Sequence, residues 1–393
     1  METTTAPPLT NSPLPSAFIE FLNQNSIDPS IYTSPAATST PRYIRLKPGT
    51  TDTDISEIEF DINCKLEKVN WLPNFYSIPP EIQIASSRSY KEGKIYGMDA
   101  ASGAAVLALN VMEGDHVLDL CAAPGAKLCM LLELLGSSGS LTGVDIAKHR
   151  LAACRTMLQK YALGDYCRLF VANGTSFSLL PLKKCTDVLI TEEGTEIFKE
   201  WTPKRSWKER RASKTRNNIT SCENQEPELI FYGKYSGVVG QSKSEVCRMS
   251  RTSDSSDFGY DKVLVDAECT HDGSIKHIQK FENWGWDTLQ QRVLDAQRTD
   301  MLTNLQLQLL TNGFRLLKIG GSLVYSTCSL TVAQNEDVVE QFLSQNPSAE
   351  LKEIDGANNW PCKSGRISKT LRFDPLTSQT SGLFIAKFTK SAA

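Results

Sequence analysis

The stretch from Val117 to Lys127 most constrains how this chain can fold, because it joins a buried strand, a tight turn and the start of a helix. Apolar residues at 117–120 predict the strand, small residues around Gly125 predict the turn, and residues 128–135 continue as an apolar-rich helix. The N–H groups at a helix N-terminus carry partial positive charge, which favours a carboxylate or a phosphate. We therefore expect a ligand of the nucleotide type against this turn.

A carboxylate follows the turn at a distance that also suits such a ligand. Leu141–Asp145 reads as the second strand, and Asp145 comes about 20 residues after Gly125, the spacing at which doubly wound folds bind ribose hydroxyls. The turn lacks the G-x-G-x-x-G pattern of dinucleotide sites, which argues against NAD. The alternative is an ordinary packing turn followed by a surface Asp.

Strands and helices alternate along the rest of the chain, which predicts an α/β fold with a parallel sheet. One later strand ends at Asp266 and leads to Cys269, and another ends in Cys328. The carboxyl ends of strands line the ligand crevice in open α/β sheets, so these residues are well placed for chemistry. The expected strands are 167–172, 260–266, 320–330 and 383–388, and the expected helices are 151–161 and 287–317.

Composition limits the location and the partners of the protein. The net charge of −3 over 393 residues does not mark a nucleic-acid binder, so any basic surface has to be local. Eleven cysteines without a Cys-x-x-Cys pair, and no secretory leader, predict reduced thiols in the nucleus or the cytoplasm. No apolar run approaches the roughly 20 residues that cross a bilayer. We expect an intracellular monomer with no membrane contact.

The chain divides into regions by composition. Residues 1–16, rich in Thr and Pro, predict a disordered tail, and residues 17–94 predict a small α+β domain. Residues 95–390 hold the ligand-binding domain, which is interrupted by a polar, low-complexity insertion at 191–258. Between residues 199 and 216 there are eight Lys or Arg against two Glu. This composition suits a solvated segment, a nuclear localisation signal or an arm that binds RNA backbone.

Two motifs together resemble the Sun family, the RsmB-like or NOL/NOP/Sun group of S-adenosylmethionine-dependent RNA cytosine-5 methyltransferases. The first is the turn at 117–127, and the second is Tyr-Ser-Thr-Cys-Ser-Leu at 325–330, which is close to the nucleophile motif of the family. The resemblance covers residues 96–176 and 260–388. It implies a Rossmann-like class I methyltransferase domain, S-adenosylmethionine as cofactor, and tRNA or rRNA as partner.

The resemblance also implies which residues hold the cofactor. Asp145 is expected at the ribose, with Asp266 nearby. Asn173 stands where class I methyltransferases often carry an acid that accepts a hydrogen bond from the adenine amino group, and its side-chain carbonyl can accept the same bond. The turn contributes Cys121, Ala122, Ala123, Pro124, Gly125, Ala126 and Lys127.

Methylation of cytosine at carbon 5 needs covalent help, because that carbon is a weak nucleophile until a thiolate adds to carbon 6. By resemblance, Cys328 attacks carbon 6, and Cys269 is the second cysteine of the family, which is associated with release. Asp266 and Lys127 match positions that hydrogen-bond the target cytosine and stabilise charge on its ring. The base has to be flipped out of its stack for this chemistry.

The N-terminal region carries a weaker resemblance. Pro41–Lys47 is similar to the arginine-bearing strand of the small RNA-recognition-like domain that precedes the catalytic domain in Sun-type enzymes. This similarity implies that Arg42, Arg45 and Lys47 contact RNA.

One departure from the family raises an alternative. Glu268 replaces the proline that usually precedes the second cysteine, and a carboxylate there is expected to raise the pKa of the Cys269 thiol. The protein would then be a catalytically impaired RNA-binding member of the same fold. A DNA cytosine methyltransferase is disfavoured, because those enzymes attack from a Pro-Cys position. A site of Cys269 with His271 or His277 lacks regular ligand spacing, so no metal is predicted.

Overall fold

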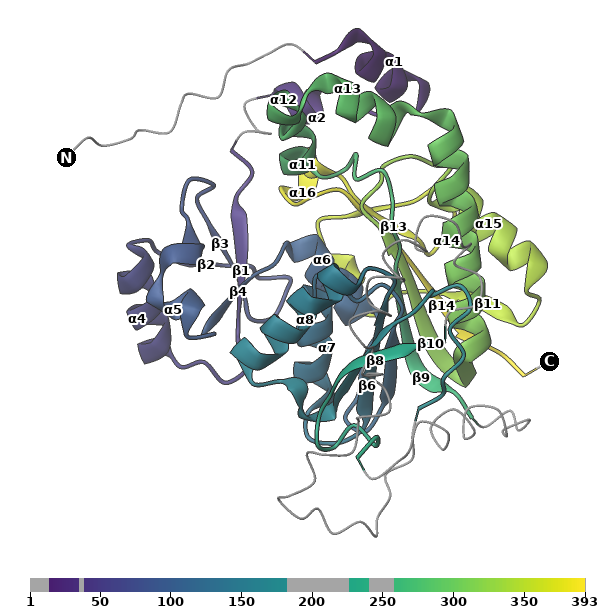
Figure 1. Cartoon of the computed structure of the whole chain (residues 1–393). Helices are drawn as coiled ribbons and strands as arrows, with labels where there is room; N and C mark the ends of the chain where they lie inside the picture. The colour runs from purple at the N-terminus through teal and green to yellow at the C-terminus, as the bar shows by residue number, and fades with distance from the viewer. Residues whose placement is uncertain (1–13, 35–38, 182–225, 240–257, 393) are drawn as a thin grey trace, which may run out of the picture.

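The computed structural model describes residues 14–34, 39–181, 226–239 and 258–392 (Figure 1). Most of the expected tail at 1–16 and all of the basic stretch at 199–216 lie outside these residues. Within the described ranges, no helix is long and apolar enough to cross a bilayer.

The centre of the molecule is a sheet of ten strands in the order β12-β13-β14-β10-β9-β5-β6-β7-β8, with β11 paired to β14. Strands β7, β6, β5, β9 and β10 are parallel, which confirms the α/β fold. The bounds are β5 (His116–Asp119), β6 (Ser140–Asp145), β7 (Cys167–Val171), β8 (Glu228–Tyr232), β9 (Tyr260–Asp266), β10 (Leu317–Thr327), β11 (Ala349–Lys352), β12 (Lys363–Ser364), β13 (Leu371–Phe373) and β14 (Leu383–Lys390).

The order of the strands fixes where a ligand can bind. From β5 the chain builds β6 and β7 on one side, and it then returns to place β9 and β10 on the other side. The loops after β5 and β9 therefore diverge and leave a crevice at the carboxyl ends of these strands. Asp119 ends β5 and Asp266 ends β9 beside that crevice.

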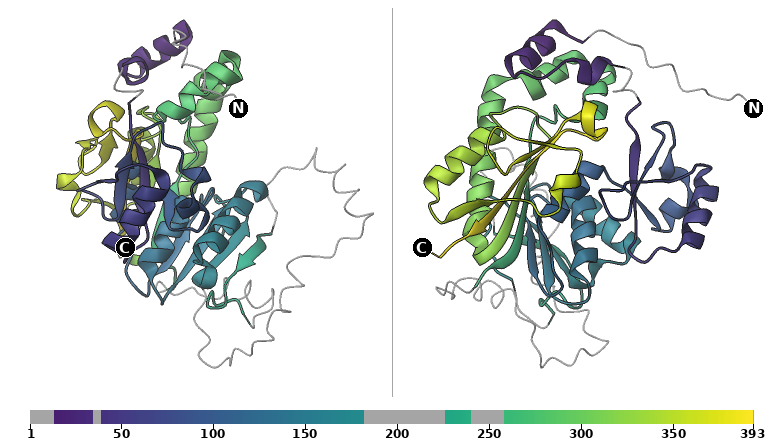
Figure 2. Two further views of the ribbon diagram at one scale, coloured as in Figure 1. Left: turned by 90° about the vertical axis from the view of Figure 1, so that its left-hand side faces the viewer. Right: turned by 180° about the vertical axis from the view of Figure 1, so that it is seen from behind.

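Helices cover both faces of the sheet (Figure 2). Leu131 and Leu158 belong to one apolar cluster, under α7 and α8, and Phe314 and Phe342 belong to another, under α14 and α15. The bounds are α6 (Ala100–Ala108), α7 (Ala126–Leu135), α8 (Lys148–Tyr161), α11 (Ile275–Gln279), α12 (Phe281–Trp284), α13 (Trp286–Leu289), a π-helical turn (Gln290–Leu294), α14 (Ala296–Leu316), α15 (Glu336–Gln345) and α16 (Pro375–Ser378).

A small N-terminal domain stands beside this core. It is a four-stranded antiparallel sheet in the order β2-β3-β1-β4, and β4 extends it to Gly97, beyond the expected boundary at 94. Thr51 and Asp54 begin α4 with a capping box, in which each side chain accepts a hydrogen bond from the backbone N–H of the other. The bounds are β1 (Arg42–Leu46), α4 (Asp52–Ile62), β2 (Glu67–Lys68), β3 (Phe75–Ile78), α5 (Arg88–Lys91) and β4 (Ile95–Gly97).

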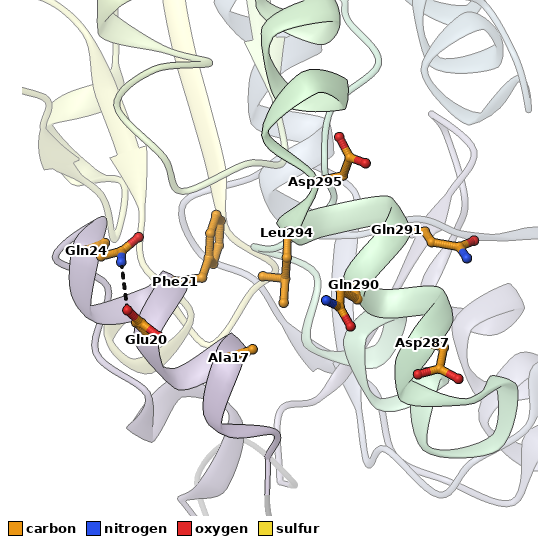
Figure 3. A pocket seen from close by; sticks show the side chains of 9 residues that line it. All are labelled: Ala17, Glu20, Phe21, Gln24, Asp287, Gln290, Gln291, Leu294 and Asp295. Atoms are coloured by element: carbon orange, nitrogen blue, oxygen red, sulfur yellow. Dashed lines mark hydrogen bonds between the residues drawn. The ribbon is translucent and has the colours of Figure 1, made fainter.

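The first two helices do not belong to that small domain, although the sequence had placed them in it. Phe18 of α1 (Ser16–Gln24) and Ile31 of α2 (Ser30–Thr33) are buried in one cluster with Phe281. Their apolar side chains therefore cover α11 to α13 of the larger domain. Figure 3 shows the groove between α1 and the segment formed by α13 and the π-helical turn, which is lined mainly by acidic and amide side chains.

Part of the expected insertion at 191–258 belongs to the sheet. Strand β8 pairs antiparallel with β7, and Leu229 is buried in the core. A strand at the edge of a sheet needs only a few apolar residues. In a polar, low-complexity stretch such a short pattern is hard to recognise from the sequence. The rest of that range, at 182–225 and 240–257, lies outside the described residues.

A buried ion pair joins the small domain to the core. Arg45 of β1 pairs with Glu133 of α7, and their side chains are only 3% and 5% exposed. The hydroxyl of Tyr96 also donates to Glu133. Removing both charges from water is costly, so each charge depends on the presence of the other.

We predict that Glu133→Gln lowers the free energy of unfolding by about 3–5 kcal/mol, because it leaves the Arg45 charge buried without its counterion. Urea unfolding followed by circular dichroism measures the change. The control is Glu350→Gln, which breaks an exposed pair with Lys352 and should change the free energy of unfolding far less. Equal losses in the two variants would contradict a structural role for the buried pair.

Candidate functional site

A cavity of about 590 Å³, which we name the strand-end cavity, opens at the carboxyl ends of the parallel strands. Its wall is built by the turn after β5, by the ends of β6 and β9, and by the loop after β10. Eight of the residues expected to bind the cofactor or the cytosine line it, namely Cys121, Ala123, Pro124, Lys127, Asp145, Asn173, Asp266 and Cys328. Ala122, Gly125 and Ala126 lie in the same turn without lining the cavity.

The turn between β5 and α7 needs glycine at one position. Gly125 has a φ of +112°, and a Cβ there would lie 3.1 Å from the Cα of Cys154 in α8. The turn is also tied to β6, because the N–H of Ala122 donates to the carbonyl of Val144 at 2.9 Å. Helix α7 begins directly afterwards at Ala126, so its first N–H groups lie beside the cavity wall.

Backbone groups hold Asp145 in place at the end of β6. One carboxylate oxygen accepts a hydrogen bond from the N–H of Ala147 at 2.8 Å, and the other accepts from the N–H of Ala123 at 3.3 Å. The residue is only 5% exposed, yet it lines the cavity. Each carboxylate oxygen has two lone pairs, so Asp145 can still accept hydrogen bonds from ligand hydroxyls.

Asn173 offers a different group from the one that the sequence suggested. Its Oδ1 accepts from the N–H and from the Oγ1 of Thr175, at 3.0 and 2.9 Å, so the carbonyl is already engaged. The side-chain NH₂ is then the group that can meet a ligand. An amide donor suits a ring nitrogen of adenine and not its amino group.

Lys127 and Asp266 form an ion pair in the cavity wall, with 2.7 Å between Nζ and Oδ2. The other oxygen of Asp266 accepts from the Oγ of Ser326 at 2.7 Å. Burial acts to lower the pKa of Lys127, but the charge and the hydrogen bond of Asp266 outweigh it and raise that pKa.

The sequence reasoning missed Asp119, whose pKa is raised to about 7 by burial and by the charge of Asp266. Its place at the end of β5 was the available signal.

The two cysteines that the resemblance singles out are in contact, with 3.2 Å between their Sγ atoms. Cys269 follows β9 and is 1% exposed, whereas Cys328 follows β10 and lines the cavity. The parallel pairing of the two strands sets Asp266 opposite Ser326. The loops after the two strands therefore begin side by side, which brings the thiols together.

The pKa values of the two thiols are shifted in opposite directions. The hydrogen bond from Cys328 lowers the pKa of Cys269 most, and His271 lowers it further against the effect of burial, to about 6. The hydrogen bond with Cys269 and burial raise the pKa of Cys328 well above its usual range. Because the sulfurs touch, they titrate as a unit: one thiolate forms readily and a second does not.

The expected effect of Glu268 on Cys269 is wrong. The carboxylate of Glu268 lies 3.2 Å from Nη2 of Arg298, and the two side chains are 48% and 40% exposed. Solvent and Arg298 screen its charge. The pKa of Cys269 is lowered and not raised, because the hydrogen bonds with Cys328 and with His271 outweigh burial. The backbone carbonyl of Glu268 accepts from Gln306 at 2.7 Å, which fixes the chain where the family usually has proline.

Cys269, His271 and Cys328 bring two sulfurs and a ring nitrogen within 4.8 Å of one another. The sulfurs are 3.2 Å apart, and Nδ1 of His271 is 2.9 Å from the sulfur of Cys328. Zinc–sulfur bonds of about 2.3 Å in a tetrahedral site would hold two sulfurs about 3.7 Å apart. The observed separations fit hydrogen bonds better than metal ligation.

The three basic residues expected to contact RNA have different surroundings. Arg45 is buried in its ion pair, which corrects the expectation that its guanidinium meets RNA. Lys47 donates to the carbonyl of Tyr161 at 3.0 Å and so also serves the contact between the domains. Arg42 is partly exposed near α11, where burial and then the charge of Arg42 lower the pKa of Lys276.

Known proteins that are similar to this chain include methyltransferases named for cytosine in rRNA. The rRNA (cytosine-C(5))-methyltransferase NOP2C of Arabidopsis thaliana is 24% identical over 352 residues, which are 78% of this chain and 55% of that protein. The 5-cytosine rRNA methyltransferase NSUN4 of Mus musculus is 30% identical over 245 residues, which are 62% of this chain and 44% of that protein. The chain thus spans about half the length of these curated relatives.

Solved structures share the fold. NSun6 from Pyrococcus horikoshii, solved with SFG, has a TM-score of 0.62 at 14% identity, and the match covers 96% of this chain and 99% of that one. The family model described as 16S rRNA methyltransferase RsmB/F matches residues 106–189 and 234–389, which are more than half of the chain. These ranges contain the turn after β5 and both cysteine loops, and the chain belongs to the RsmB/F methyltransferase family, as its motifs had predicted.

Proposed function

We propose that this protein is an RNA cytosine-5 methyltransferase that uses S-adenosylmethionine and forms a covalent bond between Cys328 and carbon 6 of the target cytosine. The observation that carries the proposal is the pair of touching thiols at the edge of the cavity that Asp145 lines. Relatives named for cytosine-C5 methylation of rRNA and of tRNA support the reaction class.

One end of the strand-end cavity has groups that fit S-adenosylmethionine. The carboxylate of Asp145 suits ribose hydroxyls, the NH₂ of Asn173 suits an adenine ring nitrogen, and the first turn of α7 suits a carboxylate. The cofactor, when bound, supplies the methyl group. The residues of this chain hold it and orient it toward the cysteine side of the cavity.

The other end has groups that fit a cytosine. The thiol pair can hold one thiolate near neutral pH, because hydrogen bonds with Cys328 and His271 lower the pKa of Cys269, and Cys328 lines the cavity. Lys127, held by Asp266, is placed to hydrogen-bond the base and stabilise negative charge on the ring as the sulfur adds. Cys269 lies against the sulfur that has to leave, so we assign it to release.

The RNA partner, tRNA or rRNA, is assigned to the face between the small domain and the cavity. Arg42 of the small domain and Lys276 of α11 supply positive charge there, and phosphate contacts of this kind do not depend on sequence. The target base would be flipped into the cavity. Monomeric state and a nuclear or cytoplasmic location stay predictions.

A catalytically impaired RNA-binding protein is the second candidate that the sequence raised. That idea depended on Glu268 raising the pKa of the thiol beside it. Glu268 pairs instead with Arg298, so this reason for preferring an inactive protein is lost.

We predict different outcomes for the two cysteines. Cys328→Ala should abolish both methyl transfer and the covalent RNA–protein adduct, because no sulfur remains to attack carbon 6. Cys269→Ala should let the adduct accumulate, because attack proceeds without release. Transfer of radiolabelled methyl to total cellular RNA and denaturing gels measure the two effects.

The matched control for these variants is Cys362→Ala, since Cys362 is a partly buried thiol that does not line the strand-end cavity. It should leave methyl transfer and adduct formation unchanged. Equal loss of adduct in Cys328→Ala and Cys269→Ala would refute the division of roles between the two thiols.

We also predict that Asp145→Ala weakens binding of S-adenosylmethionine by about 10- to 100-fold, because hydrogen bonds to a charged acceptor contribute about 1.5–3 kcal/mol. Isothermal titration calorimetry measures the affinity. Asp165→Ala, which removes an exposed carboxylate paired with Lys234, is the control and should not change it. Unchanged affinity in Asp145→Ala would place the ribose elsewhere.

A further inference from the structure

His271 has an unusual backbone conformation beside the thiol pair. Its φ is +58°, a left-handed value that costs a residue with a side chain on the order of 1 kcal/mol or more. Such a conformation persists only where the surroundings fix it. Contacts with the rest of the structure therefore fix the position of this side chain.

The loop that carries His271 is fastened to the loop that carries Cys328. The N–H of Gly273 donates to the carbonyl of Cys328 at 2.9 Å. The carboxylate of Asp272 accepts from the N–H of Leu330 at 2.7 Å. Both bonds come from residues directly after His271 and join its loop to the loop of Cys328. They therefore limit how far the imidazole can move from the sulfur.

The imidazole faces the sulfur that is exposed to the cavity. Nδ1 of His271 lies 2.9 Å from Sγ of Cys328 and 3.8 Å from Sγ of Cys269. His271 and Cys328 both line the strand-end cavity, whereas Cys269 is buried behind them. The nearer contact is thus with the thiol to which the proposed function assigns the attack.

Several charged or titratable groups surround His271. Cys269 raises its pKa most, by hydrogen bond and by charge, burial opposes this, and the charges of Asp266 and Glu268 raise it further. The ring of His277 on α11 is 5.1 Å away, and burial and the charge of His271 lower the pKa of His277 to about 4. One imidazole of the two is therefore suited to carry a proton while the other stays neutral.

We propose that His271 is the base that takes the thiol proton from Cys328, so that the resting enzyme holds a thiolate–imidazolium pair. The S–H bond breaks, an N–H bond forms at Nδ1, and the electron pair left on sulfur is the one that forms the bond to carbon 6 of cytosine. The sulfur of Cys269 lies 3.2 Å from the same sulfur, and either thiol can be the donor in the hydrogen bond between them. This role deepens the proposed function and rests on it.

The imidazolium is not consumed by the reaction. At release a base takes the proton from carbon 5, the electrons of that C–H bond restore the double bond to carbon 6, and the sulfur leaves with the C–S electron pair as a thiolate beside the same N–H group. The pair is thus restored for the next substrate. The pair of thiols as a unit can hold one thiolate at neutral pH, where an ordinary thiol with a pKa of about 8.5 is mostly protonated.

The test is the pH dependence of alkylation of Cys328 by iodoacetamide in the full chain, read peptide by peptide with mass spectrometry. His271→Asn is the variant, because Asn tolerates a left-handed backbone but has no basic nitrogen. We expect the midpoint of alkylation to rise by at least about one pH unit and the rate at pH 6.5 to fall about tenfold. The limiting rate at high pH should not change.

The matched control is His277→Asn, which removes the neighbouring imidazole that also lines the cavity. It should leave the midpoint for Cys328 in place. An unchanged midpoint in His271→Asn, or an equal shift in both variants, would overturn the proposal.

A second measurement keeps the proposal testable if His271→Asn does not fold. In the Cys269→Ser/Cys328→Ser double variant no thiolate remains, so the pKa of His271, followed by NMR, should fall relative to the wild type. An unchanged titration of His271 would overturn the pairing. Neither measurement needs RNA or S-adenosylmethionine, so a shifted midpoint with no methyl transfer by the wild type would support the pair and refute the proposed function.

Discussion

The hydrogen-bonded pairing of β9 with β10 is the interaction on which the site depends. Their register sets Asp266 opposite Ser326, so the two strands end side by side at the same edge of the sheet. Two loops from distant parts of the sequence then run side by side, with their thiols 3.2 Å apart. A change of one residue in this register would turn every side chain of one strand to the opposite face and separate the groups.

The turn after β5 adds the second half of the site to the same edge. Its path depends on close approach to α8, where Gly125 leaves room that a side chain would occupy. Lys127, in the first turn of α7, reaches across to Asp266 at the end of β9. Cofactor turn and cysteine loops are therefore joined by an ion pair, and neither can shift far without the other.

Charge is used for two distinct purposes in this molecule. The charges of Arg45 and Glu133 hold the small domain against α7, in a place where solvent cannot reach them. At Cys269 and Cys328 the pKa values are shifted in opposite directions, so one thiol of the pair loses its proton more readily than the other. The difference follows from exposure, since a buried pair with a fixed partner is structural and a charge that faces a cavity is available to a ligand.

The sequence by itself determined the α/β fold, most strands and helices of the larger domain and the family, because these depend on local periodicity and on short motifs. It also pointed to Asp145 and Asp266, which end strands, and to Cys269 and Cys328, which follow strands. Only the tertiary structure decided that Arg45 is buried, that Glu268 turns to Arg298, and that His271 meets the sulfur of Cys328. A two-residue or 3.6-residue period tells which face of an element a side chain occupies, but the partner on that face comes from contacts between distant segments.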